Sequence, residues 1–471
     1  MKAGVEWYEH AGRLVRLVKP HTNSKGIHRP DGGLIILPVD IDHAIDVMSR
    51  HCDFLKYDGR LREFKRIDCP PKLAKILLSR AGSWQFNSLS GTVLAPSPRE
   101  DGSIFDSPGY DKKSGLYLAK DNPTDYKRPV KKSKKSAAET LDIFYDLLGE
   151  FAFQTPDDFS ACVCAIISSL WRRSLDAAPL IAINASTPGT GKSYLADTIA
   201  IIATGRRSPV IGLGEDKAEA EKRLSGALMM GDQLITIDNV VVPLAGDLFC
   251  QMISQSTLAL RPLGSSQILK IPTNCTLIAN GNNIVVLGDM RRRVMLIRLD
   301  ANSERPEQRR FDRDVLSYAA EHRGKIISAS LTLSLAYAAA GFPEVDLPPY
   351  GGFAEWDKWC RRPLAWIGLP DPLKASEVFR EVDPDLATQR QLYAAWHDLH
   401  GNASLTAAAL IDSANQTMRD ALNSVCADHI SPRRLAGWLR RHKGRIVDGL
   451  RLDSEMDSHS KVQLWRLVTC G

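Results

Sequence analysis

Cysteine motifs and long apolar runs are missing from this sequence. Its nine cysteines include no C-x-x-C pair and no Cys/His cluster, so a structural zinc site is not expected. Cys162 and Cys164 lie in an apolar helical pattern, which is typical of buried thiols. No apolar stretch is long enough to cross a bilayer, and the first residues have no signal-peptide core. We therefore expect a reduced, cytoplasmic protein that makes no contact with a membrane.

Charge of one sign is not in large excess, and aromatic residues are few. The net charge is +6 and the aromatic content is 7%. A charge of this size permits nucleic-acid binding without requiring it, so the distribution of basic residues matters more than their number. A chain of 471 residues exceeds what one core supports, so we expect about two to four domains.

The most informative segment that the chain does contain is 181–200. Residues 181–185 are apolar and strand-like, 186–191 form a Gly/Pro-rich turn, and 192–200 follow a helical pattern. This is the strand–loop–helix context of a phosphate-binding P-loop, although Ser186 replaces the first glycine of the pattern. The predicted ATP-binding residues are Thr187, Pro188, Gly189, Thr190, Gly191, Lys192, Ser193 and Tyr194.

Two residues of this motif and one distant acid predict a site for Mg²⁺ and ATP. Lys192 would reach the β- and γ-phosphates, and Ser193 would ligate Mg²⁺. The apolar run 234–237 reads as a buried strand that ends in Asp238, which would hold Mg²⁺ beside Ser193. The alternation of strands and helices from 137 onward predicts an α/β fold with a parallel sheet.

Three further features follow along the chain. Residues 257–272 have the pattern of a β-hairpin around a Gly-Ser-Ser turn. The apolar strand 275–279 leads into the amide-rich run 280–283, and three consecutive arginines at 291–293 precede another apolar strand, 294–299.

Together these features resemble the AAA+ helicase modules that phages, plasmids and integrative elements encode, often fused behind a primase. The similarity is to the superfamily 3 and MCM-like type, which has a hairpin before the sensor-1 strand. The matching residues lie in 187–193, 234–240, 280–283 and 288–306. The resemblance implies an AAA+ P-loop core. Because no primase-like catalytic residues occur upstream, any priming activity would come from a separate chain.

The resemblance also implies catalytic roles. An amide at the sensor-1 position orients the attacking water; Asn282 is favoured, with Asn280 close behind. An arginine finger reaches the nucleotide of a neighbouring subunit, and Arg293 lies at that position, with Arg292 as the alternate. A finger supplied in trans requires a homo-oligomer, and we expect a hexameric ring. The alternative for these arginines is surface salt bridging.

Asn239 departs from the pattern of most AAA+ ATPases, which have a catalytic glutamate at this position. An amide can orient a water but cannot take its proton. Either another carboxylate serves, such as one from the segment Glu215–Glu221, or hydrolysis is slow. The sequence leaves both interpretations open.

The predicted hairpin has a role in the same family, where it projects into the central pore and touches the nucleic-acid backbone. Arg261 and Lys270 would then contact phosphates of the DNA. The alternative is a surface hairpin in a protein with no pore.

The C-terminal part has the pattern of a winged helix. Ser431 caps a basic helix, and two strands around a polar loop follow it. Leu435, Trp438 and Leu439 are expected to face a core. A winged helix that contacts protein is the alternative to DNA binding, for which the predicted residues are Arg433, Arg434, Arg440, Arg441 and Lys443.

The predicted organisation has five parts. They are a mixed α+β N-terminal domain (1–119), a basic linker (120–136), the AAA+ domain (137–345), lid and linker helices (346–384), and a winged-helix-like domain (385–471).

The sequence favours an ATP-dependent, ring-forming DNA helicase or translocase that acts in replication of a mobile genetic element, on single-stranded or forked DNA. One alternative is a nucleotide-gated DNA-binding or loader protein that does not unwind. Another is an ATP-dependent remodeller of protein partners.

Overall fold

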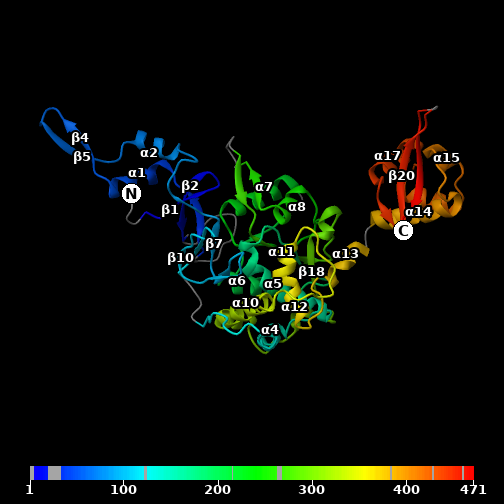
Figure 1. Cartoon of the computed structure of the whole chain (residues 1–471), viewed down its shortest axis with the longest axis horizontal. Coiled ribbons are helices and arrows are strands. Elements are labelled where there is room, and N and C mark those ends of the chain that lie inside the picture. Colours follow the sequence, from blue (N-terminus) through cyan, green and yellow to red (C-terminus); the bar gives the residue numbers. More distant parts are fainter. Residues whose placement is uncertain are drawn as a thin grey trace. The chain divides into compact units, whose positions relative to one another are not determined.

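The computed structural model describes residues 5–19, 33–120, 125–214, 216–261, 268–381, 384–426, 429–458 and 461–470. The chain divides into two compact units, Met1–Ser376 and Glu377–Gly471 (Figure 1). Among the described residues, no helix combines the length and the apolarity that a membrane crossing requires.

Five parallel strands form the central sheet of the larger unit, in the order β13-β14-β17-β12-β18. Most of their residues are buried, as expected for a parallel sheet covered on both faces. Because the strands are parallel, their carboxyl ends meet at one edge of the sheet. The mixed α/β class with a parallel sheet is confirmed. The strands are β12 (Leu180–Ala185), β13 (Val210–Ile211), β14 (Leu234–Ile237), β17 (Thr276–Asn282) and β18 (Val294–Leu299).

Buried helices pack against this sheet. Helix α6 contacts β12, β14 and β17, while α5 contacts α6 and β18. A capping box of Thr155 and Asp158 begins α5, and Asp158 is fully buried in an ion pair with Arg298 of β18. The helices and helical turns of this part are α3 (Lys134–Glu139), α4 (Leu141–Leu148), α5 (Pro156–Trp171), η1 (Arg172–Ser174), α6 (Lys192–Thr204), α7 (Lys217–Met229), α8 (Asp247–Ser254), η2 (Gly288–Arg292), η3 (Pro306–Gln308), α9 (Val315–Glu321), α10 (Arg323–Ala339), α11 (Ala354–Trp356), η4 (Asp357–Arg361), α12 (Arg362–Trp366) and η5 (Lys374–Glu377).

Arg323 supports helix α6 from its C-terminal end. Its guanidinium donates to the carbonyl oxygens of Ile201 and Ile202, each at 3.0 Å. Carbonyls of the last helical turn lack intrahelical partners, and the arginine satisfies that of Ile202; the Ile201 carbonyl oxygen also accepts from the Gly205 amide at 2.7 Å. Burial lowers the pKa of Arg323 to about 10.

The N-terminal part of the larger unit is mixed α+β, as its sequence predicts. It contains a four-stranded sheet of order β3-β2-β1-β6, a three-stranded sheet of order β10-β11-β7 and two hairpins, β4-β5 and β8-β9. The Ile36 amide donates to the Met230 carbonyl oxygen at 3.0 Å, which joins this part to the end of α7. The elements are β1 (Trp7–His10), β2 (Arg13–Val18), β3 (Ile35–Pro38), α1 (Ile41–His51), β4 (Phe54–Asp58), β5 (Glu63–Ile67), α2 (Pro71–Leu78), β6 (Asn87–Ser88), β7 (Gly91–Val93), β8 (Ser97–Pro98), β9 (Ile104–Phe105), β10 (Gly109–Tyr110) and β11 (Leu116–Leu118).

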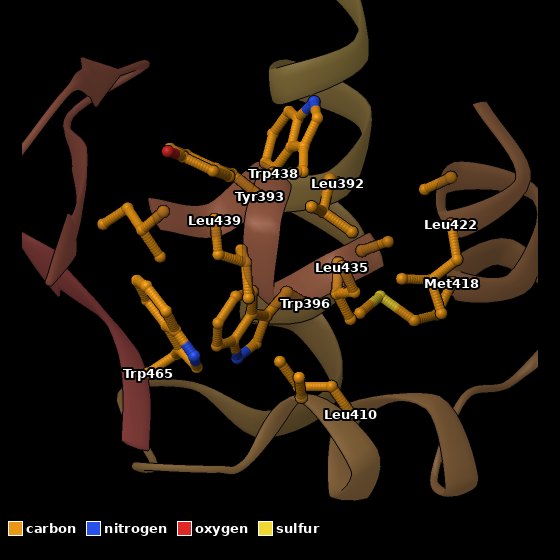
Figure 2. Packing of buried hydrophobic residues seen from close by; sticks show 14 of the residues in the cluster. Leu392, Tyr393, Trp396, Leu410, Met418, Leu422, Leu435, Trp438, Leu439 and Trp465 are labelled. Atoms are coloured by element: carbon orange, nitrogen blue, oxygen red, sulfur yellow. The ribbon is translucent and has the colours of Figure 1, made fainter. Parts of the chain in front are cut away.

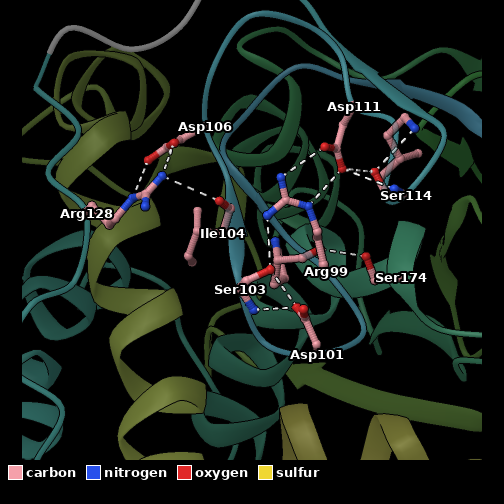
Figure 3. A network of polar contacts seen from close by, with 11 residues as sticks. Arg99, Asp101, Ser103, Ile104, Asp106, Asp111, Ser114, Arg128 and Ser174 are labelled. Atoms are coloured by element: carbon pink, nitrogen blue, oxygen red, sulfur yellow. Dashed lines mark hydrogen bonds and ion pairs between the residues drawn. The ribbon is translucent and has the colours of Figure 1, made fainter.

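A network of polar contacts fastens the chain just before the α/β part (Figure 3). Arg99 donates to both carboxylate oxygens of Asp111, at 2.8 and 3.1 Å, and to Ser103 Oγ at 3.0 Å. The Arg99 guanidinium holds the pKa of the Asp111 carboxyl well below its usual range. Ser174 Oγ donates to the Pro98 carbonyl oxygen at 2.6 Å, so η1 is tied to the same segment.

The basic linker expected at 120–136 makes specific contacts in its described residues. Asp125 accepts hydrogen bonds from the backbone of Gly324 and Lys325 at the start of α10. Arg128 forms an ion pair with Asp106 (Figure 3). The Asp125 contacts form because a carboxylate can satisfy amide groups at a helix N-terminus, which composition does not reveal.

The smaller unit packs four helices against a three-stranded sheet of order β19-β20-β21. Its core centres on Trp396, Trp465, Leu435 and Leu439, each at most 1% exposed (Figure 2). Trp438 is 7% exposed, so the three residues expected to face a core do so. The elements from the unit boundary onward are α13 (Val378–Glu381), α14 (Pro384–His400), α15 (Ala407–Asp412), α16 (Gln416–Cys426), α17 (Pro432–His442), β19 (Ile446–Val447), β20 (Leu450–Met456) and β21 (Gln463–Thr469).

Candidate functional site

The Gly/Pro-rich turn connects β12 to α6 at the carboxyl edge of the sheet. Gly189 and Gly191 have φ of +78° and +96°, a conformation that side chains with a β-carbon rarely adopt. Gly191 caps α6, so Lys192 and Ser193 are the first residues of a 13-residue helix. Backbone N–H groups and the positive end of the helix therefore converge on this loop, as an anion site requires.

Lys192 is folded back onto its own loop. Its Nζ donates to the Thr187 carbonyl oxygen at 3.1 Å and to Thr190 Oγ1 at 3.2 Å. Burial lowers the pKa of Lys192, and the carboxylate of Asp238 opposes this shift. The ammonium group thus lies on the turn, within reach of the electrostatic field of the acid that follows β14.

Ser193, Asp238 and Asn280 come together although they lie far apart in the sequence. Ser193 Oγ donates to Asp238 Oδ1 at 3.3 Å, and Asn280 Nδ2 lies 3.5 Å from Ser193 Oγ. Asp238 follows β14, while Asn280 is on β17, which lies between β14 and β12. The hydroxyl of Ser193 and the carboxylate of Asp238 supply oxygen ligands of the kind that Mg²⁺ prefers, while Asn280 directs its amide nitrogen toward them.

Asn280 also holds the residue after the acid. Its Oδ1 accepts a hydrogen bond from the Asn239 amide at 3.0 Å, and its carbonyl oxygen accepts one from Val240 at 2.9 Å. Asn239 adopts φ of +51°. Asn280 is 2% exposed, whereas Asn282 is exposed at the end of β17 and pairs with Ala185. Of the two amides that the sequence suggests for orienting the attacking water, these contacts favour Asn280 over Asn282.

A cavity of about 500 Å³ opens beside the Gly/Pro-rich turn. Gly189, Gly191 and Tyr194 form one part of its wall. The segment 306–315, which follows β18, forms another part together with Phe151. Residues 307–315 carry no local sequence signal that shows that they return to the loop.

Two arginines of this segment line the cavity. Arg309 Nη2 donates to the Glu150 carbonyl oxygen at 2.8 Å, while its Nη1 is buried with no hydrogen-bond partner among the described residues. Arg313 pairs with the Glu150 carboxylate at 3.5 Å. An unpartnered guanidinium nitrogen can donate to an anionic or polar ligand once the side chain turns it toward the cavity, since the nitrogen itself is buried. The loop, the acid and this donor together fit Mg²⁺ and a nucleoside triphosphate.

Asp197 is a further acid that the sequence analysis did not single out. It lies four residues after Ser193, on the same side of α6. Burial raises the pKa of Asp197; Arg207 at 3.5 Å opposes this shift, and the Asp238 carboxylate adds to it. The i, i+4 spacing from Ser193 was the signal that could have found it.

The segment suggested as a source of a hydrolytic base is described only in part. Glu215 lies outside the described residues. Glu219 pairs with Lys222 and Arg223 on its own helix. Glu221 lines a separate cavity of about 230 Å³.

The two candidate finger residues lie at the opposite edge of the sheet from the phosphate loop. The Arg293 carbonyl oxygen accepts from the amide of Leu180, where β12 begins, whereas the loop follows Ala185, where β12 ends. These edges are about 16 Å apart at the rise of a strand. Arg292 and Arg293 both pair with Asp289, and their side chains are 61% and 16% exposed.

The hairpin predicted at 257–272 is confirmed. It consists of β15 (Thr257–Leu260) and β16 (Leu269–Pro272), paired antiparallel. Lys270 and Arg261 are exposed, and the turn at 262–267 lies outside the described residues.

The basic residues predicted to bind DNA through the C-terminal helix are all exposed to solvent. Helix α17 buries Leu435, Trp438, Leu439 and His442 and begins at the Ser431 cap, whose side chain accepts from the Arg434 amide. The strands β20 and β21 follow as an antiparallel pair. The exposed residues are Arg433, Arg434, Arg440, Arg441 and Lys443.

Comparisons with known proteins give little. No protein-family model and no curated protein matches the chain. Its structure is similar to that of the NrS-1 C-terminal region, in its A-form apo structure, with a TM-score of 0.37 and 11% identity over 91% of this chain and 99% of that one. Two further structures of the region give TM-scores of 0.35 at 13% and 12% identity, over 92% and 91% of this chain and 100% and 98% of theirs. At these scores no residue role follows from the likeness.

Proposed function

We propose that this chain is an ATP-dependent, ring-forming DNA helicase or translocase with an AAA+ core, which acts in replication of a mobile genetic element. The observation that carries the proposal is the meeting of Ser193, Asp238 and Asn280 beside the glycine loop. In parallel α/β sheets, ligands bind at the carboxyl ends of the strands, next to a strand where the chain order switches. Strand β12 is such a strand, because its neighbours are β17 and β18.

The nucleotide proposal assigns a task to each residue of the site. The loop amides and Lys192 hold the phosphates, and Ser193 and Asp238 hold Mg²⁺, which neutralises charge on the phosphates when bound. Asn280 orients the attacking water, and Arg309 donates to the nucleotide from the cavity wall. Asp197 is a half-buried carboxylate four residues after Ser193, and we propose it as the source of a hydrolytic base in place of Asn239.

The ring proposal is supported by the distance between Arg293 and the phosphate loop. A side chain at the far edge of the sheet cannot serve the nucleotide of its own subunit. It can serve a neighbour's nucleotide in a head-to-tail ring, the arrangement by which such contacts close. Asp289 would hold Arg292 and Arg293 in place until the neighbour's phosphates replace it.

The DNA proposal is supported by exposed cations on two elements. Arg261 and Lys270 lie on the β15-β16 hairpin, and five basic residues surround the buried stripe of α17. A capped basic helix followed by a two-stranded wing is the arrangement by which winged helices lie on DNA.

The test is strand displacement. With ATP and Mg²⁺, the parent chain should separate a forked DNA duplex, and single-stranded DNA should raise its rate of ATP hydrolysis. Lys192→Ala should abolish both, while Lys325→Ala, which removes an exposed lysine at the start of α10, should leave both unchanged. Unwinding by the Lys192→Ala variant at the parental rate would refute the mechanism.

A nucleotide-gated DNA-binding or loading protein is the second candidate function. The observation in its favour is Asn239, an amide that is held by Asn280 through its backbone and cannot accept a proton from water. This function predicts tight, nucleotide-dependent DNA binding with very slow turnover and no strand displacement.

A further inference from the structure

We propose that the β4-β5 hairpin of the N-terminal part is a contact surface for single-stranded nucleic acid. The inference extends the proposed function, which places DNA on this chain, to a region with no assigned role. Figure 1 shows the hairpin beyond α1 and α2, at the far end of the N-terminal part from the sheet that holds the phosphate loop.

The hairpin exposes large apolar side chains. Tyr57 and Phe64 are cross-strand partners, 53% and 66% exposed, and their ring centroids are 5.3 Å apart. Leu55 and Leu61 are 60% and 57% exposed. Phe54 is partly buried against the core of α1 and α2, so it anchors the hairpin and leaves the aromatic pair free. Single exposed apolar residues are common, but a contiguous group indicates a binding surface.

Cations lie on the same hairpin as this pair, and one of their acidic neighbours, Asp58, is already engaged. Asp58 accepts from the backbone amides of Arg60 and Leu61 and pairs with Lys65 at 3.1 Å. These contacts close the turn and lower the pKa of the Asp58 carboxyl.

Three other cations have no such partner. Lys56, Arg60 and Arg62 are exposed, and no ion pair holds any of them within the described ranges of the chain. The exposed carboxylate of Glu63 at the same turn offsets one of these charges. A net positive charge therefore remains around the turn, where a phosphate backbone would meet it.

The combination of rings and cations distinguishes between partners. A protein partner would need acidic residues matched to the three cations and an apolar surface matched to the rings. A duplex keeps its bases stacked, so it offers the phosphates without base faces. A single strand presents both, because each base has a face that stacks on an aromatic ring and each link carries a negative charge. The surface therefore fits single-stranded nucleic acid best.

The experiment measures binding of a fluorescent oligothymidine to the full chain without nucleotide. Tyr57→Ala with Phe64→Ala should weaken binding about tenfold or more, since stacking of each base is lost. Tyr57→Phe should retain parental binding. Lys56→Gln with Arg60→Gln and Arg62→Gln should lower the slope of log affinity against log salt by about 2, because each phosphate contact contributes about 0.7. The matched control is Arg50→Gln, an exposed arginine of α1 that already pairs with Asp46.

Photo-crosslinking supplies a readout that does not depend on folding of the variants. Oligothymidine with 5-iododeoxyuridine should crosslink to peptides that contain Tyr57 or Phe64 in the parent chain. Parental binding by the alanine variants, together with crosslinks confined to other peptides, would overturn the proposal. So would a change in oligomeric state of the alanine variants with unchanged DNA affinity, because the surface would then bind another copy. A parent chain with no affinity for DNA would overturn the proposed function as well, whereas loss of ATP hydrolysis in Lys192→Ala tests that function alone.

Discussion

Glu307 lies directly on Gly189 of the phosphate loop. A β-carbon built on Gly189 would lie 3.0 Å from the Glu307 amide nitrogen and 3.2 Å from its Oε2, closer than ordinary van der Waals contact. The segment that follows β18 therefore covers the loop from outside, and Gly189 is the residue that permits the close approach.

Gly189→Ala should weaken nucleotide binding and destabilise the protein. The left-handed backbone costs a residue with a β-carbon about 1–2 kcal/mol, and the contact with Glu307 forces the loop or the covering segment to move. Titration with a fluorescent ATP analogue and thermal unfolding measure the two effects. Gly341→Ala is the matched control, since Gly341 has φ of +81° but nothing within 4 Å of its β-carbon position. Equal nucleotide affinity in the two variants would contradict the close-approach argument.

Arg309→Gln should lower ATP affinity, and thermal unfolding measures separately what loss of the hydrogen bond to the Glu150 carbonyl oxygen costs in stability. One guanidinium nitrogen of Arg309 is buried without a partner at the cavity wall, so its removal frees the protein of an unsatisfied donor while the nucleotide loses a charged one. A hydrogen bond to a charged group is worth about 1.5–3 kcal/mol, which corresponds to a loss of about tenfold or more in affinity. The neighbouring Arg310 is exposed, and Arg310→Gln should bind ATP as the parent does.

Asp111→Asn should destabilise the larger unit in a pH-dependent way. The pKa of Asp111 is lower in the folded chain than in the unfolded chain, so its pairing with Arg99 contributes stability above about pH 4. That contribution disappears as pH falls through the folded pKa. Both partners are mostly buried, and we expect a loss of about 3 kcal/mol at pH 7.

Thermal unfolding at pH 7 and at decreasing pH values below 4 checks this expectation. The difference between Asp111→Asn and the parent should be largest at neutral pH and should shrink in acid. Asp53→Asn removes an exposed partner of Arg66 and should change the unfolding temperature little at any pH. A deficit that stays constant from neutral pH into strong acid would show that charge is not its source.

Asn280→Ala should abolish most ATP hydrolysis, and Asn282→Ala should have a much smaller effect. Asn280 is buried, and its side chain contacts both the Ser193 hydroxyl and the backbone amide of Asn239. Asn282 lies two residues later on β17 and is exposed. Loss of a group that orients water reduces turnover by about 100-fold or more. Steady-state ATPase rates of the two variants distinguish them, and the reverse ranking would return the role to Asn282.

The glycine turn between a strand and a helix, and the acid that ends the neighbouring strand, could be located from the sequence because their signals are local. Gly189, Gly191 and Lys192 lie within four consecutive residues, and an apolar run that ends in Asp238 marks a buried strand wherever it stands in the sheet. The choice between Asn280 and Asn282 depends on how far each side chain is buried at the end of β17. Strand alternation puts both on one face, so periodicity cannot separate them.

The cavity wall could not be predicted, because it is made by chain that returns from another part of the fold. No local sequence signal at Glu307 or Arg309 shows that the segment that follows β18 returns to the turn that contains Gly189. The same limit applies to Asp125, which composition places in a solvated linker and which instead caps α10. Such contacts depend on tertiary position rather than on local pattern.

Mixing two inactive variants tests whether the site is shared between subunits. In Asp238→Asn the Mg²⁺ ligand is lost but Arg293 remains, and in Arg293→Ala the reverse holds. Random assembly into rings places an intact site beside an intact arginine at about a quarter of the interfaces. The mixture should therefore recover ATP hydrolysis that neither variant shows alone. Because Arg293 lies at the far edge of the sheet from its own loop, recovery can come only from a neighbour. Sedimentation with nucleotide must show that the variants assemble together, and co-assembly without recovered hydrolysis would exclude the trans role of Arg293.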